Sequence, residues 1–469
     1  MHEVPIAPVS TDRFEAVLGD DGWRALQDAA DRSRRVLDGR RVWNVNTTAY
    51  GGGVAEMLWS LLAYARGLGV DSRWLVMDGD DGFFRTTKRV HNMLHGSPGD
   101  GLGLGDDDHA AYERVSRANA DALSQLTRPG DVVILHDPQT AGLVPLVGDG
   151  RIVVWRSHIG VDVQNDIAQA GWAFLLPYFE SAHAYVFTRR EYAPAGVDPK
   201  RLVIIPPSID AFSPKNQELD DATVAAILDV SGLISGGRHD APPEFVRPDG
   251  GVEAVLRRAD LSGPPPPADA PLVLQVSRWD RLKDPVGVIE GFARYVAPHA
   301  PEAHFMYAGP AAAAVADDPE GAAVLAETRA AWETLPDGVR HRVHLANLPM
   351  DDAAENAAIV NALQRHATIV VQKSIAEGFG LTVAEAMWKA RPVVASGVGG
   401  IQDQIEDGIS GILLRDPLDL EAYGAAVTGL LQDPETERRM GEAAKERVRV
   451  EFLNTRHLMQ YEELLGRLI

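Results

Sequence analysis

The chain has 469 residues, a length typical of two or three domains. Its hydrophobic fraction of 45% and its charged fraction of 24% are those of a soluble globular protein. The formal net charge of −22 disfavours nonspecific binding to nucleic acid or to anionic membranes, so we expect neither as a partner.

The chain has no cysteine, which excludes disulfides, thiolate metal sites and a cysteine nucleophile. Its first residues lack the basic segment and apolar core of a signal peptide. No apolar run approaches the ~20 residues that are needed to span a bilayer. We therefore expect a soluble, cytoplasmic protein.

Short apolar segments alternate with helical segments along most of the chain, and this alternation predicts parallel sheets covered by helices. The expected fold class is α/β, with two doubly wound Rossmann-like domains that face each other across a cleft. The strands predicted in the first half are 41–47, 72–77, 131–135, 151–155, 184–187 and 202–205. Those predicted in the second half are 272–276, 304–307, 342–345, 368–371 and 392–395.

A stretch rich in glycine and proline separates the two series of strands. This composition places the first domain at 1–210 and the second at 271–453. Residues 211–270 are expected to form a linker or insertion that is only partly ordered in its middle.

Three consecutive glycines, Gly51, Gly52 and Gly53, follow the first strand directly after Tyr50. Apolar residues at helical spacing come next, so the glycines occupy a strand-to-helix turn. The N–H groups of such a turn suit phosphate or sugar oxygens, although the pattern is neither G-x-G-x-x-G nor a Walker loop. A merely flexible turn is the alternative interpretation.

Polar side chains also follow two later strands of the first half. Asp137 could orient an acceptor hydroxyl, or it could simply cap the next helix. His158, which follows Trp155 and Arg156, could hydrogen-bond a sugar hydroxyl near a reacting carbon. A single histidine is more often structural, and this alternative stays open.

Arg278 and Lys283 flank the connection after the first strand of the second half, and Pro285 can begin the helix that follows. A guanidinium fork and an ammonium group can hold a diphosphate from two directions. They would stabilise a leaving diphosphate without a metal. Two ordinary surface cations are the alternative.

Glu377 and Glu385 flank another glycine turn, which lies between a predicted strand and a helix. Glu385 lies about five residues into that helix, or roughly 7–8 Å along its axis. One carboxylate at the turn and another further along the helix can bind two parts of one ligand, such as the sugar and the ribose of a nucleotide sugar. Ordinary surface acids are the alternative. The glycines of 397–400 could contact phosphates or form a close-packed connection.

The sequence contains no HExxH motif, EF-hand loop, G-x-S-x-G elbow or Walker loop. It also lacks an Asp-x-Asp pair that is flanked like a metal–diphosphate site. We therefore expect neither a metal nor a cofactor.

These motifs resemble those of the retaining glycosyltransferases of family four, which have the GT-B fold. The segment from Glu377 to Glu385 is similar to their E-x7-E motif, and Arg278 with Lys283 is similar to their phosphate-binding pair. The stretches at 42–57 and 206–210 are similar to those of the trehalose-forming branch of the family.

The resemblance implies a role for each of these residues. The residues expected to bind the donor are Glu385, Gly378, Phe379, Gly380, Leu381, Asn347, Leu348, Gly52 and Gly53. Those expected to bind the acceptor are Asp137, Arg156 and Tyr50, and those expected at the reaction centre are Glu377, Arg278, Lys283 and His158. The helix at 454–469 is expected to pack back on the first domain.

The reaction implied is transfer of glucose from a nucleoside-diphosphate glucose to free glucose, which forms α,α-trehalose with retention and in a reversible manner. The alternatives are a trehalose phosphorylase that uses glucose 1-phosphate, a family-four enzyme with another acceptor and, less favoured, a nucleotide-binding protein without catalysis. The expected partners are small molecules, namely the nucleotide sugar, glucose and trehalose. A homodimer is one assembly that the sequence allows.

Overall fold

The computed structural model describes residues 1–50, 52–237, 240–311 and 320–469. The chain forms two compact units. The first unit comprises Met1–Ile209 together with Phe452–Ile469, and the second unit comprises Asp210–Glu451. Within the described ranges, no helix has the length and the apolar character needed to cross a membrane.

The first unit is built on a seven-stranded sheet with the order β1-β3-β2-β4-β5-β6-β7. Strand β1 is antiparallel to β3, and the other neighbours are parallel. The strands are β1 (His2–Val4), β2 (Val42–Asn46), β3 (Ser72–Val76), β4 (Val132–His136), β5 (Ile152–Ser157), β6 (Ala184–Phe187) and β7 (Leu202–Ile204).

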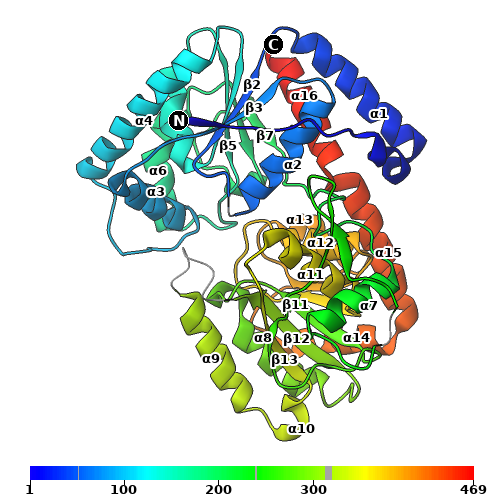
Figure 1. Ribbon diagram of the computed structural model, residues 1–469. Helices are drawn as coiled ribbons and strands as arrows, with labels where there is room; N and C mark the ends of the chain where they lie inside the picture. Colours follow the sequence, from blue (N-terminus) through cyan, green and yellow to red (C-terminus); the bar gives the residue numbers. More distant parts are fainter. Residues whose placement is uncertain (51, 238–239, 312–319) are drawn as a thin grey trace. The chain divides into compact units, whose positions relative to one another are not determined.

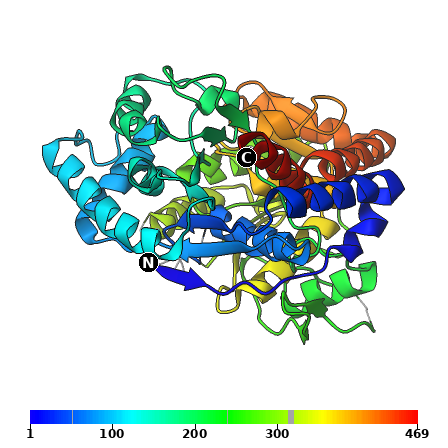
Figure 2. The same cartoon turned by 90° about the horizontal axis from the view of Figure 1, so that it is seen from above.

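Helices cover both faces of this sheet (Figure 1). The helices are α1 (Glu15–Val36), α2 (Gly53–Gly67), α3 (Asp81–Leu94), α4 (Asp106–Leu126), α5 (Val144–Val147), α6 (Asp166–Phe179) and α16 (Asn454–Leu468). Short 3-10 turns occur at Asp12–Phe14, Pro138–Leu143 and Arg190–Tyr192. Helices α1 and α16 lie side by side although they come from opposite ends of the chain (Figures 1 and 2).

Alternation along the strands divides the core of the first unit between the two faces of the sheet. In β5, Trp155 packs on the side of α4 and α6, whereas its neighbour Val154 packs on the side of α16. Leu464 and Leu465 of α16 belong to this second cluster. The last helix therefore completes the core of the first unit.

The second unit has a seven-stranded sheet with the order β10-β13-β12-β11-β14-β15-β16. Strand β10 is antiparallel to β13, and the remaining pairs are parallel. The strands are β10 (Asp260–Ser262), β11 (Leu272–Val276), β12 (His304–Pro310), β13 (Val343–Leu348), β14 (Ile369–Gln372), β15 (Val393–Ser396) and β16 (Ile412–Leu414).

Helices also pack on the sheet of the second unit (Figure 1). They are α7 (Asp221–Val230), α8 (Pro285–Gly291), α9 (Gly321–Glu333), α10 (Asp337–Arg340), α11 (Ala353–His366), α12 (Leu381–Trp388), α13 (Ile401–Gln404), α14 (Leu420–Gln432) and α15 (Pro434–Glu451). A 3-10 turn spans Arg281–Lys283, and a π-helical turn spans Phe292–Val296.

The α/β fold class and every strand predicted from the sequence are confirmed, with shifts of at most a few residues at the ends. The stretch at 211–270 is more regular than its composition suggested. It contains α7, which packs on α11, a hairpin of β8 (Glu244–Val246) and β9 (Val252–Ala254), and the edge strand β10. Edge strands of only three residues leave too little periodicity to be recognised in a segment rich in proline and glycine.

Each sheet has a switch point, where the strand order reverses. In the first unit it lies between β2 and β4, and in the second unit between β11 and β14. The loops that follow the carboxyl ends of such strands form the ligand site of a doubly wound sheet. The predicted site motifs follow these four strands and their neighbours.

Candidate active site

The glycine turn after β2 leads directly into the first turn of α2. Gly52 has φ of 79°, and a Cβ atom added there would meet nothing within 4 Å, so space is open above the turn. Gly53 is the first residue of α2, and Tyr50 is 79% exposed. Gly51, the remaining glycine of this predicted loop, lies outside the described residues.

Asp137 lies at the carboxyl end of β4 in an unusual backbone conformation. Its φ of 67° and ψ of 174° fall in a region that is almost restricted to glycine, which costs about 1–3 kcal/mol. Its carboxylate accepts a hydrogen bond of 2.8 Å from the amide of His158. It makes no capping bond to the 3-10 turn that follows, so the helix-cap interpretation was wrong. The strain instead aims the carboxylate across the strand ends towards β5.

The charge state of Asp137 is set mainly by its half-buried position. Burial raises the pKa of the Asp137 carboxyl from 3.8 to about 6, against the amide of His158 and the charge of Arg156, which both lower it. The carboxyl therefore titrates close to neutrality, in the range useful for a group that binds or exchanges protons.

His158 lies within a buried hydrogen-bonded cluster. One ring nitrogen, Nε2, is 3.1 Å from His136 Nδ1, and the other, Nδ1, accepts from Nε of Arg156 at 3.4 Å. Burial and the Arg156 charge lower the pKa of His136 to about 3. Burial likewise lowers the pKa of His158, with contributions from Arg156 and the neighbouring histidines. Both rings are therefore neutral near pH 7.

The acceptor-contact role expected of Arg156 does not fit its position. Its side chain is completely buried, and its guanidinium donates to the ring of His457, the hydroxyl of Tyr461 and the carbonyl oxygen of Ile205. A side chain with no exposed surface and with these partners lies beneath the site surface. Arg156 supports His158 rather than touching a ligand.

In the second unit, Arg278 lies after β11 with a side chain that is 60% exposed and 3.6 Å from Asp280. The backbone at this point is held firmly, because the hydroxyl of Tyr307 donates to the Arg278 carbonyl at 2.7 Å. The ring of Trp279 stacks on Tyr307 and donates to the carbonyl of Pro310. The side chain of Arg278 therefore extends from a backbone that these contacts hold in place.

Lys283 and Glu377 form an ion pair across the switch point of the second sheet. Lys283 Nζ lies 2.7 Å from Glu377 Oε2, and both side chains are largely buried. The hydroxyl of Ser374 lies 3.4 Å from the same carboxylate oxygen. The sequence placed these two residues in one site, and the structure brings them into direct contact.

Glu385 is buried on α12, and Lys215 Nζ lies 3.4 Å from its Oε1. Lys215 belongs to a loop whose carbonyl oxygens, at Pro214 and Gln217, accept from the amide of Asn361. Lys215 was not among the predicted site residues. Its sequence neighbourhood has no motif, and only the fold brings it to a helix that lies some 170 residues later in the chain.

The turn at 377–381 rests on the glycines that follow β15. Gly400 N–H donates to the carbonyl of Gly378 at 2.8 Å, and Gln404 Nε2 donates to the carbonyl of Gly380 at 3.3 Å. Phe379 is buried beneath the turn, and Leu381 begins α12. Residues 397–400 form a close-packed connection, and their contact with phosphates stays a prediction.

Asn347 and Leu348 lie inside β13 rather than in a loop after it. Both are buried, and the Asn347 amide donates to Asp260 Oδ2 of β10 at 3.2 Å. Asn347 pairs with the antiparallel edge strand β10 and Leu348 pairs with Pro310 of β12, so β13 runs beyond its predicted end and includes both residues. A direct contact between Leu348 and a nucleotide base is not supported by this buried position.

Several contributors to the site were missed by sequence reasoning besides Lys215. They are His136, His457, Tyr461, and the buried ion pair of Lys373 with Asp284, which joins the two switch-point loops of the second unit. Within the described residues, no three His, Asp or Glu side chains gather as a metal site.

Replacing Asp137 with Asn should change stability in a pH-dependent way. Because its native pKa of about 6 exceeds the unfolded value of 3.8, the native state binds the proton more tightly, and the stabilisation that this provides is lost as the pH rises from about 4 to 6. At pH 7.5 the Asn variant should be more stable than the wild type by about 1–3 kcal/mol, with the difference vanishing near pH 4. Denaturant unfolding across this range measures it, and a difference independent of pH would contradict the assignment.

Replacing Gly399 with Ala should displace the Glu377 turn. Gly399 has φ of 53°, and a Cβ atom there would collide with the carbonyl oxygen of Glu377, so we expect a loss of more than ~2 kcal/mol. Gly378→Ala is the matched control, since its Cβ atom would meet nothing within 4 Å. Equal unfolding midpoints for the two variants would refute this account of the turn.

Two family models match the chain. The model described as trehalose synthase, N-terminal domain, matches residues 44–194, and the model described as glycosyl transferases group 1 matches residues 260–447. Together they span the loops after β2, β4, β5, β11 and β14. The predicted site motifs therefore lie in the matched regions.

Relatives and solved structures agree with these models. The chain is 38% identical to a trehalose synthase from Rubrobacter xylanophilus, over 97% of this chain and 96% of the relative. It is 35% identical to a trehalose synthase from Pyrococcus horikoshii, over 97% of this chain and 95% of the relative.

The solved structure of an α,α-trehalose-phosphate synthase (UDP-forming) from Burkholderia vietnamiensis matches with a TM-score of 0.63 at 14% identity, covering 92% of this chain and 98% of that one. At this identity the match shows the fold alone, and that fold is GT-B. On the strength of its full-length relatives, the chain belongs to the trehalose synthase family and is a glycosyltransferase.

Proposed function

We propose that this enzyme transfers glucose from a nucleoside-diphosphate glucose to the anomeric hydroxyl of free glucose and so forms α,α-trehalose with retention. The observation that carries the proposal is the Lys283–Glu377 pair at the switch point of the second sheet, with Arg278 on the adjoining loop. It places two cations and a carboxylate where a doubly wound sheet binds its ligand. The membership of the trehalose synthase family supports the sugar product.

In this proposal the second unit binds the donor. Arg278 and Lys283 would hold the diphosphate, and Glu377 with the N–H groups of the 378–381 turn would hold the glucose. Gly380, in the αL conformation, is the N-cap of α12, whose N-terminus adds favourable potential for a phosphate. Glu385, one turn deeper in the same helix, would accept hydrogen bonds from the ribose hydroxyls, in exchange for part of its contact with Lys215.

The first unit would bind the acceptor glucose at the loops after β2, β4 and β5. The Asp137 carboxylate is ionised above its pKa of about 6 and can then accept from a glucose hydroxyl. Tyr50 and the open turn at Gly52 offer a ring and backbone N–H groups to sugar. His158 lies in the buried cluster beneath this surface, and it remains neutral because burial and Arg156 lower its pKa.

Retention without a carboxylate nucleophile points to attack from the face that the diphosphate leaves. The bond between the anomeric carbon and the diphosphate oxygen would break as the acceptor oxygen bonds to that carbon, and the leaving phosphate oxygen would accept the proton of the acceptor hydroxyl. Arg278 and Lys283 would stabilise the charge that develops on the diphosphate. This scheme asks for no metal, and the assays are therefore run without one.

Removing either cation should slow turnover. We expect Arg278→Ala and Lys283→Ala to lower kcat by on the order of 10²–10³, because each loses a charge that stabilises the leaving diphosphate. Arg281→Ala is the matched control, since this arginine lies in the same turn but pairs with Glu327. Steady-state kinetics with the nucleotide sugar decide the matter, and near-normal turnover in both test variants would disprove the phosphate-clamp assignment.

The function itself is tested by incubating the purified protein with glucose and a panel of nucleoside-diphosphate glucoses, or with glucose 1-phosphate, and separating the products by chromatography. A non-reducing disaccharide together with stoichiometric nucleoside diphosphate is the expected result. Disaccharide that forms from glucose only when the donor is glucose 1-phosphate, with release of free phosphate, would instead identify a phosphorylase. Nucleotide release with no disaccharide from glucose would indicate a different acceptor.

A further inference from the structure

The buried guanidinium of Arg156 connects the last helix of the chain to the candidate acceptor site. Its Nη1 donates to His457 Nε2 at 2.9 Å and to the hydroxyl of Tyr461 at 2.7 Å. Its Nε faces His158 Nδ1 at 3.4 Å. Among the described residues, none of its hydrogen bonds goes to a carboxylate, so neutral groups hold this charge.

These bonds fix which nitrogen of each histidine carries the proton. Arginine can only donate, so His158 Nδ1 accepts from it and the ring proton of His158 must lie on Nε2. That proton faces His136 Nδ1 at 3.1 Å, and His136 Nε2 in turn faces the Asn44 side-chain oxygen at 3.1 Å. The chain of hydrogen bonds has one direction, from Arg156 to Asn44.

The same reasoning applies on the side of α16. His457 Nε2 accepts from Arg156, so its proton lies on Nδ1, which is 2.9 Å from the hydroxyl of Ser208. Ser208 donates onward to the Asn454 side chain at 2.7 Å. Both nitrogens of the His457 ring are therefore used, and the imidazole cannot rotate without breaking a bond.

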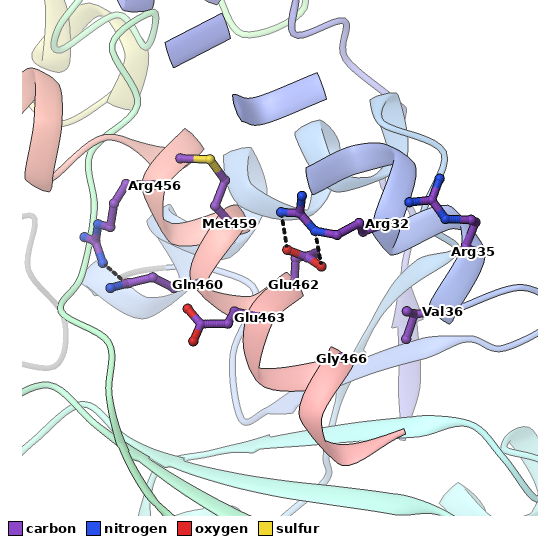
Figure 3. Close-up of a pocket in the computed structure, with 9 residues that line it drawn as sticks. All are labelled: Arg32, Arg35, Val36, Arg456, Met459, Gln460, Glu462, Glu463 and Gly466. Atoms are coloured by element: carbon purple, nitrogen blue, oxygen red, sulfur yellow. Dashed lines mark hydrogen bonds and ion pairs between the residues drawn. The ribbon is translucent and has the colours of Figure 1, made fainter. Parts of the chain in front are cut away.

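Helix α16 is itself held firmly against the first unit. Arg32 of α1 makes a two-point contact with Glu462 at 3.0 and 2.9 Å, which Figure 3 shows beside a surface pocket of about 570 Å³. Arg456 donates to the carbonyl oxygens of Pro206 and Pro207. None of the predicted site residues lines this pocket. The outer face of α16 thus anchors the helix, and the inner face carries His457 and Tyr461, one turn apart.

We propose that His457 and Tyr461 are positioning residues that fix the guanidinium of Arg156, and through it the orientation and tautomer of His158. The proposal rests on the proposed function only in placing His158 beside the acceptor glucose. If Arg156 only filled space in the core, a pair of histidine rings would not be needed to accept its hydrogen bonds. Apolar side chains of similar volume would fill the same space without the free-energy cost of burying a charge. The continuous path from α16 to His158 is what a positioning role requires.

The test compares two amide variants of His457. Gln places its oxygen near the position of Nε2 and keeps an acceptor for Arg156, whereas Asn keeps a donor near Nδ1 and loses that acceptor. We expect His457→Asn to lower kcat by about 10²-fold, while the KM for the nucleotide sugar stays near the wild-type value, because the predicted donor residues other than Gly52 and Gly53 belong to the second unit. His457→Gln should retain most of the activity, and Glu463→Gln on the exposed face of α16 is the control.

A second readout does not depend on activity. Nitrogen-15 spectra of histidine-labelled protein, assigned with His158→Gln, report the tautomer of His158. The wild type should show a proton on Nε2, and His457→Asn should show a mixture of tautomers. Tyr461→Phe, which removes only the hydroxyl acceptor, provides a milder variant with the same direction of change should His457→Asn fail to fold.

The outcomes separate the two proposals. If the wild type forms no trehalose but the His158 spectrum changes in His457→Asn, the positioning role stands and the proposed function fails. If the wild type forms trehalose while His457→Asn matches His457→Gln in both kcat and spectrum, the positioning role is wrong. Loss of activity in both variants with an unchanged His158 spectrum would also overturn it.

Discussion

A guanidinium charge buried at the end of β5 is the constraint on which the arrangement of the first unit depends. Arg156 has no exposed surface, and every one of its donors must find an acceptor within the fold. The acceptors are the carbonyl oxygen of Ile205 after β7, the ring of His158, and the side chains of His457 and Tyr461 on α16. Because α16 is the last helix of the chain, the site surface is organised only when the whole first unit is complete.

The same charge sets the protonation of the groups around it. It contributes to the lowered pKa of His136 and of His158, and it opposes the effect of burial on Asp137. Neutral imidazoles can accept as well as donate, which a hydrogen-bonded chain of fixed direction requires. In the second unit the buried charges are instead paired with opposite charges. Each glutamate of the E-x7-E motif has a lysine beside it, Lys283 at Glu377 and Lys215 at Glu385.

Much of this could be predicted from the sequence. The strands are short apolar segments with clear turn signals, and the motifs follow them at the positions where doubly wound sheets bind ligands. Glu377, Lys283 and Arg278 were predicted in this way, and the structure brings the first two into contact. Local sequence patterns could not predict the residues that contact the site from distant parts of the chain, such as Lys215 beside Glu385 and His457 beside Arg156.

Two errors have a common physical origin. The resemblance implied that Arg156 contacts the acceptor, but its side chain has no exposed surface and its guanidinium is held by His457 and Tyr461 of α16. Asn347 and Leu348 were placed after a strand that was predicted to end at Leu345, whereas pairing with β10 and β12 extends β13 to Leu348. Both depend on packing between elements rather than on the local pattern.

The most direct test of glucosyl transfer with retention uses acceptor glucose that carries carbon-13 at C1, with an unlabelled nucleoside-diphosphate glucose as the donor. The one-bond carbon–proton coupling reports the configuration at the labelled carbon, and the coupling between H1 and H2 of the other ring reports it at the carbon that comes from the donor. We predict that the labelled carbon enters a non-reducing disaccharide in which both anomeric centres are α. A reducing disaccharide, or a β configuration at the carbon that comes from the donor, would contradict it.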